Sequence, residues 1–544
     1  MNHEHNKNRI NRRKFLAASG LFGAVTVTGC SIFSEDNAAK KDKDSGKKPN
    51  LLFIFTDEHP AKAWSKGIPL LKTPNLDRLA REGITVTNCI SNNPICVPYR
   101  ATLFTGLYGH QTGFVNNHDA FPLDGKLPSW SKTLKKLGYK MGYVGKWHLY
   151  PGGERPVWQD DSSKSSQEDQ TYTVLNRIDP SRSIWEEQVL PSPEFKKPAN
   201  ITPPHLRHGF DDLWIQSSNH NKPRNTYVWD KDGKYKKIND YAPTFLTDRF
   251  IEFLDENRKS DKPFCAVLSI LPPHPSYPGA KEKWVDYYKS IETPFWENVP
   301  EEHRTPRNMR NLKNFYAQIS SVDEEIGRIL DKLDQWHLAE NTIVIFTSDH
   351  GDLHYAHGVK WKRYPYEESI RVPFIARYPG KLPPGKTDDL LLGAIDIAPT
   401  LLGLTGNSEH IPNTMQGMDL SSRLCTGRGP EPDSQFILYN LPEETHYIIK
   451  KQPKLKDYRG VRTKRWTFTL QKDPQTGKIS PWHLFDNHKD PLQLHNLCAE
   501  PEYAALRKQL TDKILKYLQL VGEPDWLNDT PKDRHKIPGK RLTV

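Results

Sequence analysis

The segment from Pro94 to Gly106 places a single cysteine, Cys96, at the start of a predicted helix, with Pro98 and Arg100 just behind it. The first turn of a helix presents unpaired backbone N–H groups and a partial positive charge, so a side chain there is suited to binding or becoming an anion. Taken alone, the residue could equally be a buried structural thiol, the commoner fate of a free cysteine. The other segments of the chain decide between these two interpretations.

Acidic and imidazole side chains follow two apolar runs. Asp57 ends the run 50–56, and Asp349 and His350 follow the run 342–346. Continuous apolar runs of this length are typical of buried parallel strands, and open α/β folds bind ligands at the carboxyl edge of such strands. Carboxylate oxygens and an imidazole nitrogen are ligands fit for a hard divalent cation such as Ca²⁺ or Mg²⁺. The pattern therefore predicts a metal site at this edge.

Cationic groups are expected at the same edge, and they are Arg100, Lys146, His148, His274 and Lys362. Lys146 and His148 would share one side of an extended segment, because side chains alternate there. A metal surrounded by cations is arranged to hold an oxyanion. Any one of these residues could be an ordinary surface charge, but their recurrence at several strand ends favours a site.

Alternating strands and helices across residues 50–405 predict an α/β fold with a large, mostly parallel sheet sandwiched between helices. From about residue 430 the pattern changes. Segments 460–468 and 483–486 read as strands of a smaller antiparallel sheet, with a closing helix over 503–518. Residues 151–245 are rich in Ser, Asp, Gln and Pro and are interpreted as an excursion that carries specificity.

The amino terminus reads as a bacterial export signal. Arg12 and Arg13 precede an apolar run from Leu16 to Thr28 that is too short for a permanent membrane span. The run ends before Cys30 in the manner of a lipoprotein cleavage site, although an ordinary signal peptide is the alternative. We expect a signal peptide over 1–29, a flexible tether over 30–48 and membrane attachment through lipidated Cys30, in the cell envelope (periplasm or cell surface).

Charge and cysteine content narrow the classes of partner. The formal charge of +11 falls to about +7 without residues 1–29, which suits an anionic substrate. Basic and aromatic residues do not interleave as a nucleic-acid groove requires, so no nucleic-acid partner is expected. With Cys30 and Cys96 set aside, the remaining four of the six cysteines are irregularly spaced and predict no disulfide framework.

Together these motifs resemble the type I, formylglycine-dependent sulfatases of the alkaline phosphatase superfamily. The resemblance covers about residues 49–500. It implies an alkaline phosphatase-like catalytic domain over 49–425, containing the excursion, and a C-terminal subdomain over 426–544. The matching motifs are Cys96-Val97-Pro98-Tyr99-Arg100 with Thr105-Gly106, Gly145-Lys146-Trp147-His148, Pro273-His274-Pro275, Ser348-Asp349-His350-Gly351, and Tyr366-Glu367-Glu368-Ser369 before Arg371-Val372-Pro373.

By this resemblance a maturation enzyme would oxidise Cys96 to formylglycine (3-oxoalanine), whose hydrate binds the metal and attacks sulfur. Asp57, Asp349, His350 and the modified Cys96 would hold a divalent ion, Ca²⁺ or else Mg²⁺ or Mn²⁺, and Asp349 would help activate the attacking hydroxyl. This is covalent catalysis combined with metal-ion catalysis.

The same resemblance implies roles for the cationic residues. Arg100 would steady the hydrate, while Lys146, Lys362 and His274 would bind the sulfate group. His274 would also donate a proton to the leaving alcohol, and His148 would take the last hydroxyl proton so that sulfate is eliminated.

Three positions depart from the commonest family pattern. Tyr99 stands where many members have Ser, Glu58 stands where many have a second aspartate, and His350 replaces the Asn of some members. Tyr99 lies in the motif that the maturation enzyme would recognise, so it could affect the conversion of Cys96. Glu58 is not included among the expected metal ligands. His350 would offer the metal a nitrogen atom in place of an oxygen atom.

The predicted activity is hydrolysis of sulfate esters, with a sulfated carbohydrate favoured over a small aryl ester. Two alternatives remain open on the sequence. One is a phosphonate or phosphate ester hydrolase of the same superfamily, and the other is a non-catalytic, lipid-anchored binder of sulfated glycans.

Overall fold

The computed structural model describes residues 47–117, 122–150, 171–179, 184–191, 201–217, 223–275, 278–441, 452, 454–473 and 476–527. The predicted signal peptide, Cys30 and nearly all of the tether lie outside the described residues, as do parts of the 151–245 excursion. Among the helices within the described ranges, none combines the length and the apolar composition needed to cross a bilayer.

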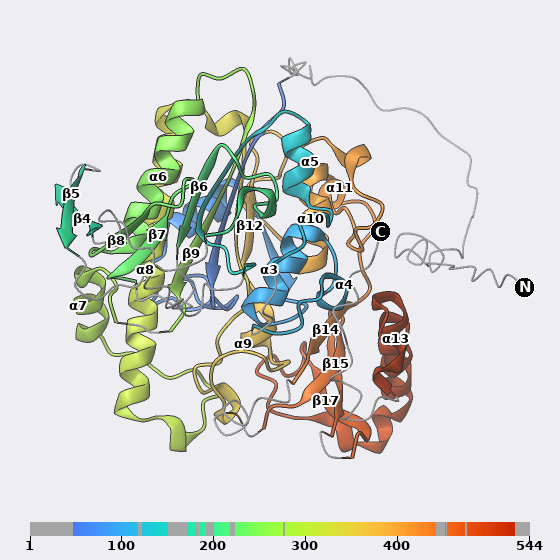
Figure 1. Ribbon diagram of the computed structural model, residues 1–544. Helices are drawn as coiled ribbons and strands as arrows, with labels where there is room; N and C mark the ends of the chain where they lie inside the picture. The colour runs from blue at the N-terminus through green and yellow to red at the C-terminus, as the bar shows by residue number, and fades with distance from the viewer. Residues whose placement is uncertain are drawn as a thin grey trace, which may run out of the picture.

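The larger of two sheets has thirteen strands in the described residues, with a parallel centre (Figure 1). β1 lies between β10 and β9, so that Leu51 pairs with Ile343 on one side and with Cys265 on the other. The parallel run continues from β9 through β3 to β6. These central strands are β10 (Thr342–Ser348), β1 (Asn50–Asp57), β9 (Phe264–Pro273), β3 (Lys140–Lys146) and β6 (Leu213–Ser217).

Antiparallel pairs extend the sheet on both sides of this centre. On one side β12 joins β10 to β2, while β11 and β13 also pair with β2, the last in parallel. On the other side β7, β8, β4 and β5 follow β6, with antiparallel pairing except between β8 and β4, which are parallel. Their bounds are β2 (Ile84–Ile90), β11 (Arg371–Val372), β12 (Phe374–Arg377), β13 (Lys386–Gly393), β7 (Thr226–Trp229), β8 (Tyr235–Ile238), β4 (Thr171–Asp179) and β5 (Ile184–Pro191).

Helices cover both faces of the sheet, because successive side chains of each central strand point to opposite sides. In β1, Phe53 packs with α3 (Cys96–Thr105), α5 (Trp130–Lys136) and α10 (Ala394–Leu404). Its neighbour Ile54 packs with the helices of the other face. Those helices are α2 (Pro74–Glu82), α6 (Ala242–Asn257) and α8 (Pro306–Gln335).

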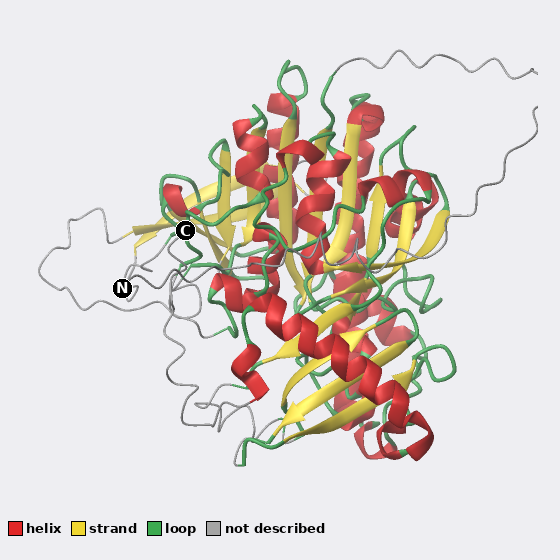
Figure 2. Cartoon of the chain, turned by 90° about the vertical axis from the view of Figure 1, so that its right-hand side faces the viewer, coloured by secondary structure: helices red, strands yellow, loops and turns green. Residues whose placement is uncertain are grey.

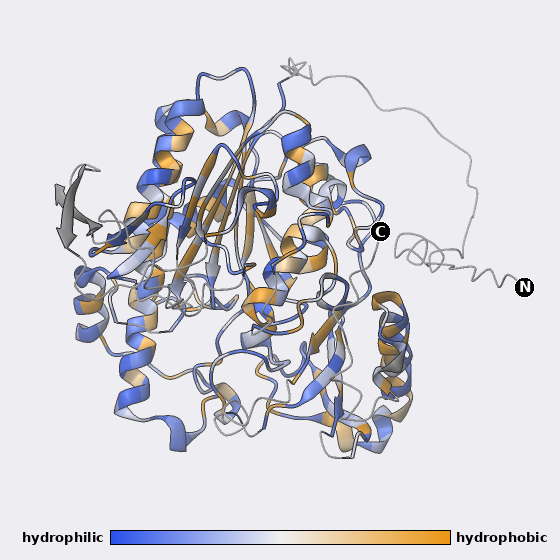
Figure 3. Ribbon diagram, in the orientation of Figure 1, coloured by the Kyte–Doolittle hydropathy of each residue, from blue (hydrophilic) through white to orange (hydrophobic). Residues whose placement is uncertain are grey.

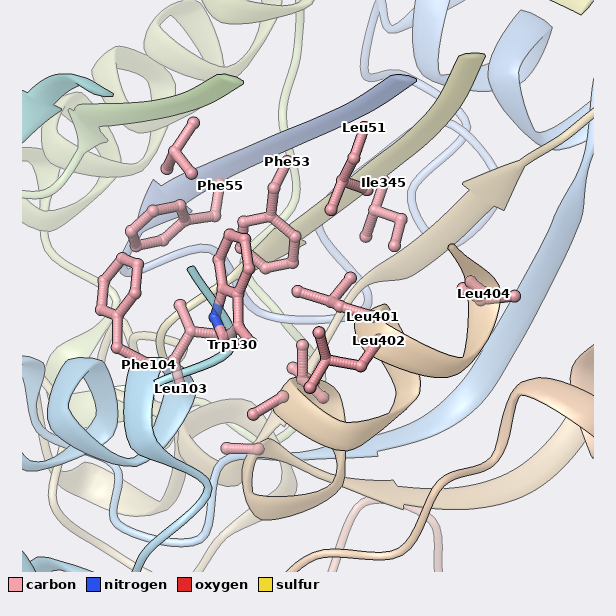
Figure 4. Packing of buried hydrophobic residues seen from close by; sticks show 14 of the residues in the cluster. Leu51, Phe53, Phe55, Leu103, Phe104, Trp130, Ile345, Leu401, Leu402 and Leu404 are labelled. Atoms are coloured by element: carbon pink, nitrogen blue, oxygen red, sulfur yellow. The ribbon is translucent and has the colours of Figure 1, made fainter. Parts of the chain in front are cut away.

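The core on the α3 side is rich in aromatic rings, as the close view in Figure 4 shows. Phe104 of α3 stacks on Trp130 of α5 with ring centroids 5.8 Å apart, and Phe53 of β1 lies 6.3 Å from the same tryptophan. Figure 3 shows the central strands as largely hydrophobic, with hydrophilic residues on the outer helices. This packing fixes the start of α3, and therefore Cys96, against the end of the sheet.

The second sheet is antiparallel, four-stranded and covered by α13 (Figure 2). Phe436 of its first strand stacks on Tyr517 of α13 at 5.2 Å. The elements are β14 (Gln435–Tyr439), β15 (Asp457–Arg462), β16 (Trp466–Lys472), β17 (Ile479–Asp486) and α13 (Ala504–Val521). Shorter helices elsewhere are α4 (Gly109–Thr112), α7 (Glu282–Ser290), α9 (Glu367–Ile370) and α11 (Ser421–Thr426).

The predicted fold class is confirmed, since a mixed sheet with a parallel centre is accompanied by a C-terminal antiparallel sheet. The excursion predicted over 151–245 differs in its second half, because β6 at Leu213–Ser217 is a strand of the large sheet paired with β3. The polar composition around this short apolar segment conceals it in the sequence. The domain boundaries and the specificity role of residues 151–245 stay predictions.

Candidate active site

The site lies where β1 and β10 end. Because the two strands are parallel and Thr56 pairs with Ser348, the next residues, Asp57 and Asp349, emerge side by side. The N-terminus of α3 meets the same edge and brings Cys96 to the carboxylates. All three side chains are buried.

Four predicted metal ligands converge within this edge. Ligand atoms of Asp57, Cys96, Asp349 and His350 all lie within 4.8 Å of one another. Cys96 Sγ lies 3.3 Å from His350 Nε2 and 3.6 Å from Asp57 Oδ1. His350 Nε2 in turn lies 3.4 Å from Asp349 Oδ1.

Arg100 lies one helical turn beyond Cys96 and binds the far side of both carboxylates. Its Nη2 donates to Oδ2 of Asp57 at 3.0 Å and to Oδ2 of Asp349 at 3.3 Å. Its Nη1 donates to the Lys146 carbonyl at 2.6 Å and to Ser269 Oγ at 2.9 Å. The guanidinium therefore orients both acids and leaves their Oδ1 atoms facing Cys96 and His350.

Lys146, at the end of β3, donates from Nζ to Asp57 Oδ2 at 2.7 Å. Burial alone would raise the pKa of Asp57, but Lys146, His274, Arg100 and Lys362 outweigh burial and hold that pKa well below its usual range. Asp349 behaves in the opposite way, because burial and the negative charge of Asp57 raise its pKa to about 6. The neighbouring positive charges therefore offset the burial of Asp57 but not that of Asp349.

Lys362 completes the surroundings of Cys96. Its Nζ donates to Cys96 Sγ at 3.2 Å. Burial and Asp57 oppose ionisation of the thiol, but Lys146, Lys362 and His350 together lower the pKa of Cys96 well below the ordinary value. The flanking residues Trp361 and Arg363 have positive φ angles of 67° and 87°. Backbone held in this region by non-glycine residues is a feature of functional loops.

Glu58 was left out of the expected ligands, and the structure places it at the site. It has a φ of 65°, is buried, and forms an ion pair with Lys362 through Oε1. Oε2 is buried and has no hydrogen-bond partner in the part of the chain that the structure describes. Burial raises the pKa of Glu58 to about 8 even though Lys362 opposes this, and Asp352 adds to the increase.

His274 follows β9 and lies at the margin of the same cluster. Its Nε2 is 3.8 Å from Glu58 Oε1, and its Nδ1 contacts the Pro275 carbonyl. Asp57, Glu58 and His274 also form a second group with ligand atoms within 4.8 Å. Burial and the charge of Lys362 lower the pKa of His274 to about 3, so the imidazole is neutral near pH 7. Contact with a carbonyl then requires the proton on Nδ1, which leaves Nε2 as an acceptor.

His148 is buried two residues after Lys146, with a φ of 60°. It belongs to neither of the two groups of converging ligand atoms among the described residues. The structure therefore brings together Asp57, Cys96, Arg100, Lys146, His274, Asp349, His350 and Lys362, while His148 is buried two residues after Lys146.

The residues present fit a divalent cation. Two carboxylates, an imidazole nitrogen and the residue at position 96 offer the mixed oxygen and nitrogen ligands that such ions take. The buried Oε2 of Glu58 without a protein partner is a further oxygen that a cation could satisfy. The Tyr99 side chain is buried in the hydrophobic cluster on the α3 side of the sheet, and Tyr99 belongs to neither group of converging ligand atoms among the described residues.

The sequence signal for Glu58 was its position directly after Asp57. What the sequence could not show is the ion pair with Lys362, because that contact depends on the loop after β10. Ser269 was missed as well, and it lies on β9, where the apolar run gives a polar residue no distinguishing signal.

Comparison with known proteins identifies the family. The family model described as Sulfatase matches residues 49–407, and one described as N-sulphoglucosamine sulphohydrolase, C-terminal, matches residues 356–519. The chain belongs to the type I sulfatase family. This sulfatase therefore has the family and the enzyme class that its motifs predicted.

Similar proteins cover nearly the whole chain. An ulvan-active sulfatase of Formosa agariphila is 32% identical over 491 residues, which are 89% of this chain and 83% of the relative. An endo-4-O-sulfatase of Bacteroides thetaiotaomicron is 28% identical over 534 residues, 93% of this chain and 99% of the relative. A solved sulfatase structure from work on glycosaminoglycan metabolism by B. thetaiotaomicron has a TM-score of 0.75 at 27% identity, covering 90% of this chain and 99% of that one.

Proposed function

We propose that this sulfatase removes sulfate from a sulfated carbohydrate, with formylglycine derived from Cys96 as nucleophile and a divalent cation as cofactor. The observation that carries the proposal is the position of Cys96. Its Sγ contacts Lys362, His350 and Asp57 at 3.2, 3.3 and 3.6 Å in a buried, charge-dense site. A nucleophile at this position would lie beside Lys362, which can bind the sulfate ester, and beside Asp57 and His350, which can bind a metal ion.

Asp57, Asp349 and His350 would hold the cation together with the residue at position 96, and Glu58 is a further candidate ligand. Ca²⁺ is the expected ion, with Mg²⁺ or Mn²⁺ as alternatives, since the donors include several oxygens. When bound, the cation supplies positive charge that stabilises an anion at position 96 and on the ester. Arg100 fixes the two aspartates from the opposite side.

The sulfate group would be bound by Lys146, Lys362 and His274. Lys146 and Lys362 are buried and charged, and buried cations bind an oxyanion more strongly than exposed ones because water does not screen them. In the reaction one hydroxyl of the hydrated aldehyde would give its proton to Asp349 and attack sulfur, and the bond from sulfur to the alcohol oxygen breaks. The product alcohol takes its proton from Nε2 of His274, which would first take that proton from water once the bound ester anion offsets the charge of Lys362.

The second half of the reaction regenerates the aldehyde. Loss of the proton from the remaining hydroxyl expels sulfate, and we assign that proton to His148, which is buried two residues after Lys146. Water then hydrates the aldehyde again. The general acid and the general base are therefore two different histidines, which follow β9 and β3 in the chain.

A carbohydrate substrate is supported by the relatives. The two nearest in identity reported above are named for activity on ulvan and for removal of 4-O-sulfate, and the solved structure comes from work on glycosaminoglycans. The positive charge of the chain is consistent with a polyanionic substrate.

The decisive experiment measures turnover of aryl sulfate, aryl phosphate and a panel of sulfated saccharides by enzyme produced with a maturation enzyme. We expect sulfated saccharides to give the highest kcat/KM. Cys96→Ala should lower kcat/KM at least about 10³-fold, because it removes the nucleophile. Cys425→Ala, at a half-buried cysteine of α11, is the matched control and should keep full activity.

Each alternative predicts a different result. A higher kcat/KM on the phosphorus ester would assign the protein to phosphonate or phosphate ester hydrolysis. Unmodified cysteine at position 96 in protein from the native host, seen by mass spectrometry, would indicate a glycan binder without catalysis. Full turnover by Cys96→Ala would exclude the assigned nucleophile.

We also propose attachment to the cell envelope through lipidated Cys30, on the evidence of the residues 12–30 that precede the described part of the chain. Labelling with a radioactive fatty acid should mark the wild-type protein in membranes. Cys30→Ala should abolish labelling and release the protein to the soluble fraction. A labelled Cys30→Ala protein would contradict the assignment.

A further inference from the structure

A cavity of about 390 Å³, separate from the cluster around Cys96, opens between the loop after β10 and the C-terminal sheet. Its described lining consists mainly of Tyr364, Tyr366, Trp482, His483, Lys454 and Lys456. The volume lies in the range of ligand pockets. We refer to it as the aromatic–lysine pocket.

The aromatic side chains of this pocket form a continuous wall. Tyr364 and Tyr366 lie with ring centroids 6.2 Å apart, and Tyr366 lies 5.1 Å from His483. His483 stacks on Trp482 at 4.1 Å with an interplanar angle of 26°. Amphipathic rings of this kind offer flat apolar faces together with polar edges, which suits a ligand that has both C–H surfaces and hydroxyl groups.

The two lysines of the pocket have no acidic partner among the described residues. Within the described part of the chain neither Lys454 nor Lys456 forms an ion pair, and none of the described lining residues is acidic. A second cavity beside α9 differs, because there Arg462 is paired with Glu367 and Lys464 with Asp389. The aromatic–lysine pocket therefore selects an anion, whereas the other cavity has its charges satisfied.

Two buried polar atoms in the lining have no hydrogen-bond partner in the described residues. They are the Tyr364 hydroxyl and Nδ1 of His483, whose side chain is 5% exposed. Burial lowers the pKa of His483 to about 3, so its ring is neutral and can exchange hydrogen bonds with hydroxyl groups. Buried polar groups without partners are uncommon in folded proteins and indicate a missing partner.

The chain segment that lines the pocket also contributes a residue to the site around Cys96. Tyr364 is two residues from Lys362, whose Nζ contacts Cys96. Because a residue spans at most ~3.6 Å of extended chain, the Cα atoms of Lys362 and Tyr364 are within about 7 Å of each other. One extended molecule could therefore occupy both places.

We propose that the aromatic–lysine pocket binds a second, anionic sugar unit of the same glycan whose sulfate ester is hydrolysed beside Cys96. The aromatic wall packs against the sugar ring, and Lys454 and Lys456 bind its sulfate or carboxylate. The inference rests on the proposed function and adds that the enzyme recognises the charge of a neighbouring unit. Short substrates that lack this unit are then poor substrates.

The test measures binding separately from turnover. Sulfated tetrasaccharides prepared from ulvan and from chondroitin 4-sulfate are titrated into Cys96→Ala protein by calorimetry, with desulfated tetrasaccharides and inorganic sulfate as comparisons. The double substitution Lys454→Gln, Lys456→Gln in this background should weaken binding of at least one sulfated tetrasaccharide about tenfold or more, because two charge-assisted contacts are lost. Lys478→Gln, Lys489→Gln, at lysines outside the pocket, is the matched control and should bind as before.

Turnover supplies the second measurement. In the active enzyme the Lys454→Gln, Lys456→Gln substitutions should lower the ratio of kcat/KM on the tetrasaccharide to kcat/KM on aryl sulfate at least about fivefold. Trp482→Ala should lower the same ratio. Lost binding in the Cys96→Ala background together with absent sulfatase turnover would uphold the pocket and reject the proposed reaction.

Three results would overturn the inference. They are unchanged tetrasaccharide binding by the lysine variant, equal binding of sulfated and desulfated tetrasaccharides, and absence of tetrasaccharide binding to Cys96→Ala protein. Equal loss of activity on aryl sulfate and tetrasaccharide would overturn it as well, because the lysines would then act on the reaction centre.

Discussion

Two buried clusters of charge in this sulfatase differ in how completely their groups are paired. In the C-terminal sheet Arg459 of β15 forms two parallel hydrogen bonds with Glu523, each 2.9 Å long, and a third with Asp457 at 3.1 Å. His110 lies 2.6 Å from the same glutamate. Each charge there has a partner of opposite sign within reach.

At the edge of the large sheet the pairing is incomplete. Asp57 and Asp349 share one guanidinium, Lys146 adds a contact to Asp57 alone, and Oε2 of Glu58 has no partner among the described residues. Crowded like charges and an unsatisfied oxygen are costly unless a ligand compensates them. The comparison assigns the Arg459 cluster to stability of the fold, while the cluster around Cys96 is consistent with the proposed cation and anionic substrate.

The largest effect that would test the difference between the two clusters is the loss of activity on removal of the proposed metal. Stripping the enzyme with EDTA should lower sulfatase activity at least about 100-fold, because the cation compensates Asp57, Asp349 and the anionic ester. The thermal midpoint should fall as well, since the carboxylates lose their counter-charge. Activity is then restored with Ca²⁺, Mg²⁺ or Mn²⁺ added singly. Full activity in protein shown by elemental analysis to be free of metal would contradict the prediction.

Glu58→Gln tests the unsatisfied oxygen directly. We expect kcat/KM to fall about 10–100-fold and metal affinity to weaken, because an amide beside Lys362 cannot ionise to meet a bound cation as the carboxyl group can. Glu58→Asp keeps the carboxylate and serves as the matched variant that should retain more activity. Equal kcat/KM and metal affinity in Glu58→Gln and wild-type protein would show that Glu58 has neither role.

In the paired cluster the expected effect is on stability. Burial alone would raise the pKa of Glu523, but Arg459 and His110 outweigh it and lower the pKa to about 2. A lowered folded-state pKa means that the ionised group stabilises the fold above about pH 4.5, and that this contribution is lost as the pH falls from 4.5 toward 2. Glu523→Gln should lower the free energy of unfolding by about 2–3 kcal/mol at pH 7.

The difference between Glu523→Gln and wild type should shrink as the pH falls through that window. Thermal unfolding measured at several pH values checks this, with the exposed Glu502→Gln as control, and kcat on aryl sulfate should be unaffected by either change. A constant difference in stability between pH 7 and pH 2.5 would mean that the ionised form of Glu523 is not what stabilises the cluster.

The smallest effect is expected at an exposed ion pair. Lys508 and Asp512 are one turn apart on α13, with a 3.0 Å contact in solvent. Lys508→Ala should change the thermal midpoint by less than about 1 °C and leave activity unchanged, because solvent screens such pairs. A larger decrease would show that pairing outside the buried clusters also contributes to the stability of this helix.

Much of the candidate site could be predicted from the sequence, because the relevant residues follow apolar runs. Asp57 and Asp349 come directly after strands that the apolar pattern identifies, and parallel neighbours deliver their ends to one edge. Cys96 and Arg100 are one helical turn apart, so a helix alone places them on one side. Glu58 was not predicted as a site residue, because its ion pair with Lys362 depends on the conformation of the loop after β10. Residues beside Lys362 in that loop have positive φ angles, and the local sequence does not determine this conformation.

The sequence by itself determined the alternation of strands and helices, the residues at the strand ends and the family motif around Cys96, since these depend on period, burial and local spacing. The tertiary structure decided the rest. It placed β6 in the large sheet, joined Arg459 to Glu523 across 64 residues, and brought Lys454 and Trp482 to one cavity. Such contacts depend on how the two sheets pack together, and no local pattern in the chain specifies that packing.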